Sequence, residues 1–139
     1  MAYEMKSFDD FKVGDKNSFT KTITETDVIL FAGISGDFNP LHMNDEYAKT
    51  TVFKSRICHG MLVESLFGPA GAPFFGGASV YMGHTQKFKA PTRMGDTITA
   101  FVEVAEKIEE KKILKVHNYA VNQDGVIVID GEATVKILK

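Results

Sequence analysis

The chain has 139 residues, of which 44% are hydrophobic and 24% are charged, an ordinary mixture for a globular domain. This composition excludes a disordered, collagen-like or coiled-coil chain, and the length predicts a single domain over residues 1–139. Sixteen Lys and Arg against eighteen Asp and Glu give a net charge of −2. We therefore expect no nucleic acid and no membrane surface as a partner, because both require a clustered basic excess.

Residues 18–24 alternate between Ser or Thr and other side chains, which predicts a first β-strand. Thr24 or Thr26 can then cap a helix whose end is loosened by Gly33 and Gly36.

The next segment contains a turn and two further helices. The composition Asp-Phe-Asn-Pro at residues 37–40 predicts a turn, and a short helix follows at about residues 45–49. Residues 60–67 form the most apolar helical candidate, which we expect to end at Gly68-Pro69. Apolar side chains lie nearly all round this helix, so we expect other elements to enclose it.

From residue 78 onward the sequence is rich in Val, Ile, Tyr, Phe and Thr, and turn-forming segments interrupt it. This texture predicts four strands, at residues 79–89, 97–106, 112–121 and 126–138. One strand, a helical segment and four meandering strands indicate an α+β fold. Its antiparallel sheet needs a cover for one apolar face, and the helix at residues 60–67 is the natural one.

The cysteine content and the hydropathy of the chain indicate the cellular compartment in which we expect the protein. The single cysteine, Cys58, excludes an internal disulfide and a cysteine-based zinc cage. The first ten residues do not resemble a secretory signal, because acids are mixed with apolar residues there. The longest uncharged stretch, residues 65–86, contains Pro69, Pro73 and several glycines, which argues against a membrane helix. We therefore expect a cytoplasmic protein.

The polar pair Asp37 and His42 flanks the Asn-Pro turn, which can bring the two side chains together. A carboxylate beside an imidazole is the minimal equipment for general acid–base chemistry near neutral pH. The alternative is that Asp37 is only a turn residue and His42 only a surface side chain.

Residues 35–42, Ser-Gly-Asp-Phe-Asn-Pro-Leu-His, resemble the hydratase-2 motif of MaoC-like dehydratases and (R)-specific enoyl-CoA hydratases. The similarity extends through Cys-His-Gly-Met-Leu-Val-Glu-Ser at residues 58–65. It also includes shorter matches at residues 81–83, 88–91, 95–96 and 131–133. The chain is most similar to the short single-domain members used in polyhydroxyalkanoate supply.

This resemblance implies a hot-dog fold, in which a bent antiparallel sheet wraps around a central α-helix, and a homodimer. It also implies that Asp37 and His42 form a catalytic dyad and that Ser65 belongs to the same site. We further expect Asn39 and Gly60 to contact the substrate. Gly60 has a physical case of its own, because unpaired N–H groups at a helix start can stabilise a negatively charged carbonyl oxygen. Equally, Gly60 can simply begin a buried helix.

Other polar residues have weaker claims. A helix N-terminus can activate Cys58, but no orienting group is evident nearby. His59, His84 and His117 lack metal-ligand spacing, so we expect no metal, and His59 is better interpreted as a capping or supporting residue. Basic side chains that can reach coenzyme A phosphates are Lys54, Arg56, Lys87, Lys89 and Arg93.

These observations favour an (R)-specific enoyl-CoA hydratase that adds water reversibly to a trans-2-enoyl-CoA to give an (R)-3-hydroxyacyl-CoA. We expect no cofactor besides the coenzyme A of the substrate. Which of Asp37 and His42 is the acid stays open, as does chain length, for which Phe67, Phe74, Phe75 and Met82 are candidate tunnel walls. The alternatives are a hot-dog acyl-CoA thioesterase, an acyl-carrier-protein dehydratase and a non-catalytic acyl-CoA-binding module.

Overall fold

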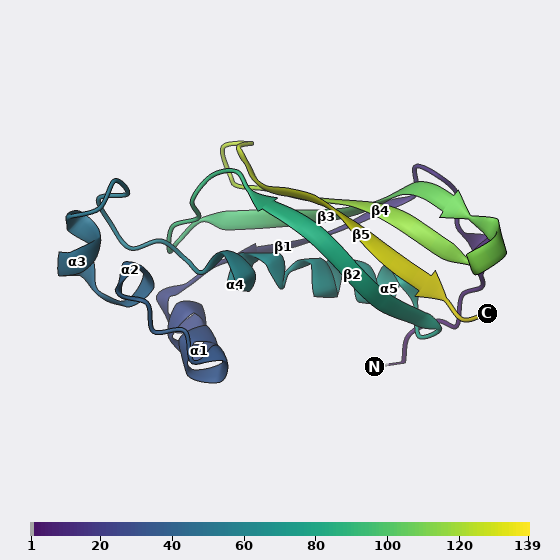
Figure 1. Cartoon of the computed structure of the whole chain (residues 1–139), viewed down its shortest axis with the longest axis horizontal. Coiled ribbons are helices and arrows are strands. Elements are labelled where there is room, and N and C mark those ends of the chain that lie inside the picture. Colours follow the sequence, from purple (N-terminus) through teal and green to yellow (C-terminus); the bar gives the residue numbers. More distant parts are fainter. Residues whose placement is uncertain (1) are drawn as a thin grey trace.

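The computed structural model describes residues 2–139, and its main element is a five-stranded antiparallel sheet (Figure 1). The strands lie in the order β1-β3-β4-β5-β2, so β1 and β2 are the edges. Their bounds are β1 Lys16–Thr22, β2 Ser79–Phe88, β3 Thr97–Ile108, β4 Ile113–Val121 and β5 Ile127–Ile137. The four strands predicted after residue 78 are confirmed to within about two residues at each end.

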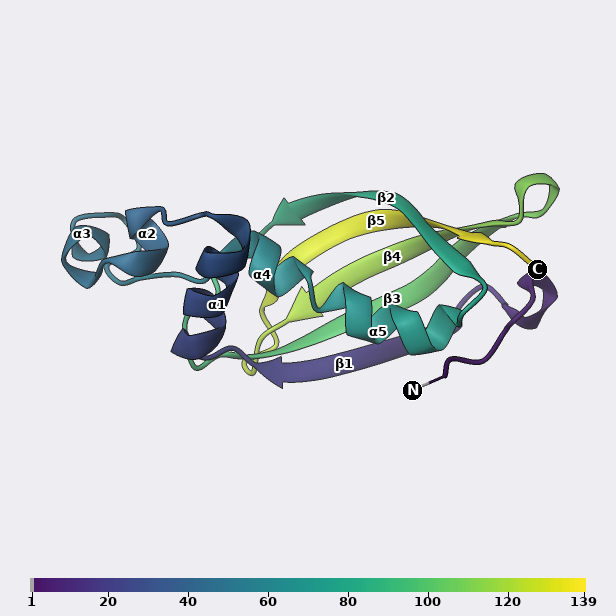
Figure 2. The ribbon, with the colours of Figure 1, turned by 90° about the horizontal axis from the view of Figure 1, so that it is seen from below.

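The sheet has one core face, as the period of two along its strands requires. Buried and less buried positions alternate along β3 and β4. The inward positions of β4 are Leu114, Val116, Asn118 and Ala120, and all four are buried. The sheet curves around a helical segment that runs along this face (Figure 2). The expected α+β arrangement of a bent sheet around a central helix is therefore confirmed.

The central helix consists of two pieces, α4 (Gly60–Glu64) and α5 (Phe67–Phe75). The prediction that the helix ends at Gly68-Pro69 is wrong. Pro69 lies in the first turn of α5, where a missing N–H costs nothing because those N–H groups have no partner within the helix. The interruption falls instead at Ser65 and Leu66, which keep right-handed helical dihedral angles.

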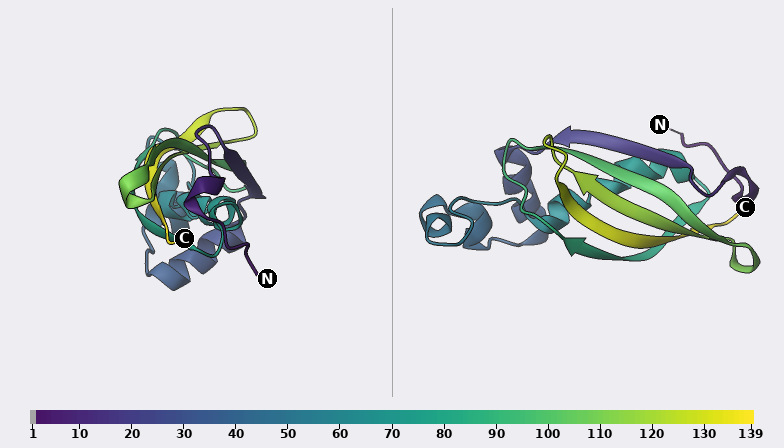
Figure 3. Two further views of the ribbon diagram at one scale, coloured as in Figure 1. Left: turned by 90° about the vertical axis from the view of Figure 1, so that its right-hand side faces the viewer. Right: turned by 90° about the horizontal axis from the view of Figure 1, so that it is seen from above.

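Three further helices, α1 (Glu25–Ser35), α2 (Pro40–Met43) and α3 (Asp45–Lys49), lie beyond the end of the sheet next to α4 (Figures 1 and 3). We call this group the overhang, residues 25–49. Thr24 caps α1, and Asp27 completes a capping box with it. The segment predicted as a simple turn, residues 37–40, leads directly into α2, because Asn39 caps that helix and proline occupies its first position.

Two short 3₁₀ helices, Phe8–Asp10 and Glu109–Lys111, complete the helices found in residues 2–139. No helix within residues 2–139 has both the length and the apolar character needed to cross a membrane.

Gly131 provides a test of how tightly the sheet is packed. A Cβ atom on Gly131 would collide with the backbone oxygen of Thr85 and would lie 2.9 Å from Cα of Gln86, both on the neighbouring strand β2. We therefore expect Gly131→Ala to lower the free energy of unfolding by about 1–3 kcal/mol in a urea titration.

Gly33→Ala is the matched control, because Gly33 lies within α1 and a Cβ there would meet no atom within 4 Å. It should leave the free energy of unfolding unchanged or raise it by up to about 1 kcal/mol, since alanine has the better helix propensity. Equal stability of the Gly131→Ala protein and the unmodified protein would show that β2 and β5 are not packed as described.

Candidate active site

The loop between α1 and α2 is shaped by hydrogen bonds from its own side chains. Gly36 ends α1 in the left-handed conformation, with φ at 79°. The Ser35 hydroxyl then accepts from the Asp37 N–H at 3.1 Å, and Asp37 Oδ1 accepts from the Asn39 N–H at 3.1 Å. These local bonds turn the chain directly after α1 and leave the second carboxylate oxygen of Asp37 free.

His42 lies on α2, and a backbone carbonyl determines which of its ring nitrogens carries the proton. Nδ1 is 2.8 Å from the carbonyl oxygen of Ile57. A carbonyl oxygen only accepts, so Nδ1 carries the hydrogen and Nε2 keeps a free lone pair in the neutral ring. His42 is thus prepared to exchange a proton at Nε2.

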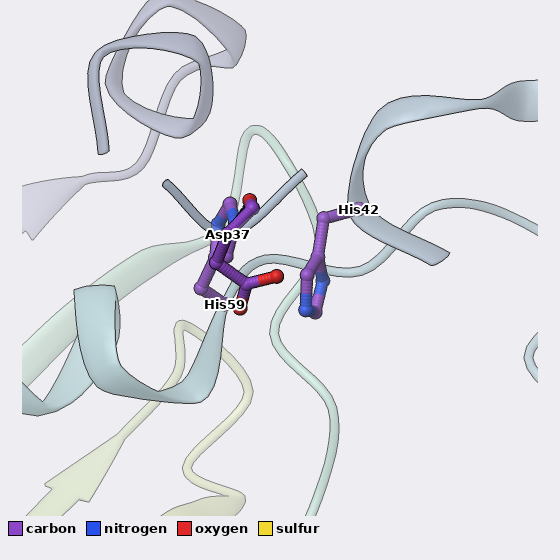
Figure 4. Close-up of side chains that lie close together, drawn as sticks. All are labelled: Asp37, His42 and His59. Carbon is purple, nitrogen blue, oxygen red and sulfur yellow. Dashed lines mark hydrogen bonds between the residues drawn. The ribbon is translucent and has the colours of Figure 1, made fainter. Parts of the chain in front are cut away.

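Asp37 and His42 lie side by side, as the motif predicts, and His59 joins them (Figure 4). A polar side-chain atom of each residue lies within 4.8 Å of those of the other two. Asp37 is exposed, His42 is half-buried and His59 is buried. These residue types can hold a cation or exchange protons. Their spacing in the chain gave no sign that His59 would complete the cluster.

His59 supports both members of the pair. Its Nε2–H donates to the backbone oxygen of Asp37 at 2.9 Å, and its ring lies against the ring of His42 with centroids 4.1 Å apart. Within residues 2–139, its Nδ1 has no hydrogen-bond partner and is buried. Because the backbone oxygen of Asp37 accepts from Nε2–H, Nδ1 carries the lone pair when the His59 ring is neutral. It occupies the cap position of α4 but makes no capping bond, so only the supporting part of its interpretation is correct.

Gly60 begins α4 and lines a cavity of about 370 Å³ together with His42. In the part of the chain that the structure describes, its N–H donates to no protein acceptor. A Cβ atom at this position would lie 2.6–2.9 Å from the ring of Phe88. The glycine is therefore required for the close approach of Phe88, and it also leaves a free N–H beside His42.

Ser65 and Asn39 are engaged elsewhere. Ser65 Oγ donates to the Leu62 carbonyl at 2.5 Å. Ser65 lines a second cavity, of about 520 Å³, while His42 and Gly60 line the first. Asn39 Oδ1 accepts from the Leu41 N–H at 3.0 Å and so serves as the cap of α2. The structure thus gathers Asp37 and His42 closely, but no hydrogen bond within residues 2–139 joins Ser65 to either residue.

Cys58 is unsuited to nucleophilic chemistry. Burial raises the pKa of its thiol to about 12, and the nearby carboxylates act in the same direction. A thiol with so high a pKa stays protonated at neutral pH, whereas the thiolate is the reactive form.

Some of the predicted basic residues and tunnel walls line one of the two cavities, and others do not. Arg56 is held by Glu25 and Asp45, whereas Lys89 lines the 370 Å³ cavity beside His42. Phe67 and Phe75 line the 520 Å³ cavity. The two other predicted walls lie elsewhere: Phe74 packs against Phe11, and Met82 is exposed.

Comparison with known proteins agrees with this geometry. The chain is 46% identical over 131 residues to an (R)-specific enoyl-CoA hydratase of Rhodospirillum rubrum, covering 94% of this chain and 90% of the relative. It is 38% identical to a mitochondrial 3-hydroxyacyl-[acyl-carrier-protein] dehydratase of Solanum lycopersicum, covering 88% of this chain and 75% of the relative. These relatives confirm the expectation of an enzyme that adds or removes water.

A solved structure of a relative has the same fold. The (R)-hydratase of Aeromonas caviae, described as involved in polyhydroxyalkanoate biosynthesis, matches with a TM-score of 0.86 at 41% identity. The match covers 91% of this chain and 97% of that chain. Residues 10–124 match the family model described as MaoC like domain. The chain therefore belongs to the MaoC-like domain family, as residues 35–42 indicated.

Proposed function

We propose that this protein is an (R)-specific enoyl-CoA hydratase, which interconverts a trans-2-enoyl-CoA and an (R)-3-hydroxyacyl-CoA. The observation that carries this proposal is the close pair of Asp37 and His42 beside the free N–H of Gly60. The names of the two hydratase relatives, from Rhodospirillum rubrum and Aeromonas caviae, support the same reaction.

The proposed reaction needs two proton transfers. The oxygen of water bonds to C3 of the enoyl chain, and the electron pair of the double bond moves toward the thioester carbonyl. One member of the Asp37–His42 pair takes a proton from the water, and the other gives a proton to C2. His42 takes part through Nε2, since Nδ1 is held by Ile57. Hydration involves no net oxidation or reduction, so we propose that coenzyme A, as part of the substrate, is the only cofactor group involved.

Gly60 is proposed to stabilise the intermediate charge. When water adds at C3, negative charge develops on the thioester carbonyl oxygen. The Gly60 N–H lines the same cavity as His42 and donates to no other group among residues 2–139. A preorganised N–H of this kind stabilises such an oxygen most when water is excluded. Lys89, in the same cavity, is the basic residue best placed for the coenzyme A phosphates.

We further propose one domain per chain and two chains per molecule. Strand β2 is an unpaired edge with large exposed side chains, including Val80 at 40%, Met82 at 57% and Phe88 at 55% exposure. An apolar sheet edge invites pairing with a second copy. The exposed position of Asp37 in the overhang fits a site that a second chain covers.

The first test of this function is removal of the two proton-transfer groups. Asp37→Asn removes the charge and basicity while keeping the shape, and His42→Ala removes Nε2. Each should lower kcat for crotonyl-CoA by about 10²–10⁴-fold, the usual contribution of a positioned acid or base. Because both act on one transition state, the double variant should lose much less than the product of the two losses. Ser65→Ala should cost less than either single change.

Matched controls are Asp124→Asn, in the hairpin turn, and His117→Ala, on the outer face of β4. Both should keep the full rate. Loss of enoyl absorbance without release of thiol identifies a hydratase. Release of free thiol would identify a thioesterase. Binding of the acyl-CoA without turnover would identify a non-catalytic module. Folded Asp37→Asn and His42→Ala proteins that stay within about threefold of the parent rate, far short of the usual loss, would contradict the proposed dyad.

The second test is the assembly state. Sedimentation velocity should give an active species of twice the 15.3 kDa chain mass. Val80→Lys should shift the protein toward monomer, because a charged edge strand resists pairing. Val52→Lys, at an equally apolar but distant exposed loop position, should leave the dimer intact. An active monomer at assay concentration would overturn this proposal.

A further inference from the structure

The 520 Å³ cavity lies between α4–α5 and the inner face of the sheet, and its wall contains a row of polar side chains. Most of its lining is apolar, contributed by residues such as Phe67, Phe75, Val102 and Val135. Six polar residues interrupt this lining: Ser65, Ser79 and a group of four, Glu64, Tyr81, His84 and Asn118. Cavities of this size with a few placed polar groups are typical of binding sites for small organic groups.

The four polar residues form one hydrogen-bonded chain, which we call the polar relay. Asn118 Nδ2 lies 3.4 Å from the Tyr81 hydroxyl, which lies 3.0 Å from His84 Nδ1. At the other end, His84 Nε2 lies 2.6 Å from Glu64 Oε1. The relay thus joins β4, β2 and α4 across one side of the cavity.

An irregularity in β2 makes the relay possible. In a regular strand, residues three apart lie on opposite faces. The pairing of β2 with β5 shifts between Tyr81 and Gly83, so one extra residue is inserted there. As a result Tyr81 lies opposite Val135 and His84 opposite Ala133, both of which are buried on the inner face. The bulge therefore turns Tyr81 and His84 to the same side.

The costly member of the relay is Asn118, which is buried on the apolar face, whereas Tyr81 is 51% exposed. Asn118 is 1% exposed and occupies the position between Val116 and Ala120 on the inner face of β4. Its Oδ1 is buried and has no hydrogen-bond partner within residues 2–139. An unsatisfied buried carbonyl costs on the order of 1–3 kcal/mol. A well-packed apolar side chain at this position would avoid that cost, so packing alone does not account for Asn118.

The directions of the hydrogen bonds define what the relay can still bind. Asn118 Nδ2–H donates to the Tyr81 hydroxyl, and each ring nitrogen of His84 is engaged within the relay, Nδ1 by Tyr81 and Nε2 by Glu64. Burial raises the pKa of Tyr81, so its hydroxyl keeps its proton. Among residues 2–139, the oxygens left without a donor are Glu64 Oε2 and Asn118 Oδ1. The relay therefore offers two acceptor oxygens that a bound group could use.

We propose that this cavity receives the acyl chain of the substrate and that the relay selects chains carrying a hydroxyl group beyond the double bond. The inference rests on the proposed hydratase function. Met61 connects the cavity to the site, because it lines both this cavity and the one beside His42. A hydroxyl at the chain end can donate a hydrogen bond to Glu64. A methyl group there would desolvate the Glu64 carboxylate without replacing its hydrogen bonds to water. A carboxylate end would face the charge of Glu64 directly.

The test compares trans-2-enoyl-CoA substrates that differ only at the chain end. For chains of five to eight carbons, the terminal group is methyl, hydroxyl or carboxylate, and kcat/KM is measured for each. Hydroxyl and methyl have nearly the same size, so their ratio isolates the hydrogen bond. We expect at least one chain length at which the hydroxyl compound is preferred by about tenfold or more, equivalent to ~1.4 kcal/mol.

Two variants assign the preference to the relay. Glu64→Met keeps the length of the side chain but removes the acceptor, and it should abolish or reverse the preference for hydroxyl over methyl. Asn118→Leu, nearly equal in shape, should reduce it. Glu132→Gln removes a carboxylate that pairs with Lys115 outside the cavity, and it should leave the preference unchanged. Because a preference is a ratio of rates, general damage to the enzyme cancels from it.

The outcomes separate the two proposals. Suppose that the protein hydrates crotonyl-CoA but uses methyl-ended or carboxylate-ended chains as well as, or better than, hydroxyl-ended chains at every length. This result overturns the role proposed for the polar relay but leaves the hydratase function. A hydroxyl preference that persists in Glu64→Met also overturns it. Failure of the unmodified protein to hydrate any enoyl-CoA overturns the hydratase function, and the relay proposal falls with it.

Discussion

The hydrogen bond from His59 to the backbone oxygen of Asp37 is the contact on which the site depends. The bond joins two parts of the molecule, since His59 immediately precedes α4 and Asp37 lies in the overhang beyond the end of the sheet. The same imidazole lies against His42, so one buried ring supports both proposed catalytic residues.

The start of the central helix organises the rest of the molecule around this contact. His42 and Gly60 line the cavity where we propose that the thioester lies. Ser65, one turn further on, lines the larger cavity where we propose that the acyl chain lies. The division between the two cavities therefore follows α4, with Met61 common to both. The interrupted helix and the bulge in β2 are departures from regular structure, and both adjoin the larger cavity.

Much of this arrangement could be predicted from the sequence, because it depends on short-range signals. The alternation of β-branched residues defined the strands, and Thr24, one of the two expected candidates, caps α1. The pairing of Asp37 with His42 followed from the turn between them. The predicted end of the central helix was wrong because the effect of a helix breaker depends on its position in the helix. Gly68 and Pro69 act as helix breakers in isolation, yet Pro69 is harmless in the first turn of a new helix.

The residues that the sequence could not place are those that meet through tertiary structure. His59 lies 17 residues after His42 in the chain, and no spacing rule brings the two rings together. The polar relay combines three elements and depends on a bulge, whose position is set by pairing with β5. Ser65 is the opposite case. The motif associates Ser65 with the dyad, but in the structure it lines the neighbouring cavity.

The most direct measurement of the central claim is nitrogen-15 NMR of the protein labelled in its histidines, followed through the titration of each ring. The tautomer of each ring decides which nitrogen can exchange a proton with substrate. The contacts predict that the neutral ring of His42 carries its proton on Nδ1 and that the neutral ring of His59 carries its proton on Nε2. The opposite tautomer in either ring would contradict the proposed site.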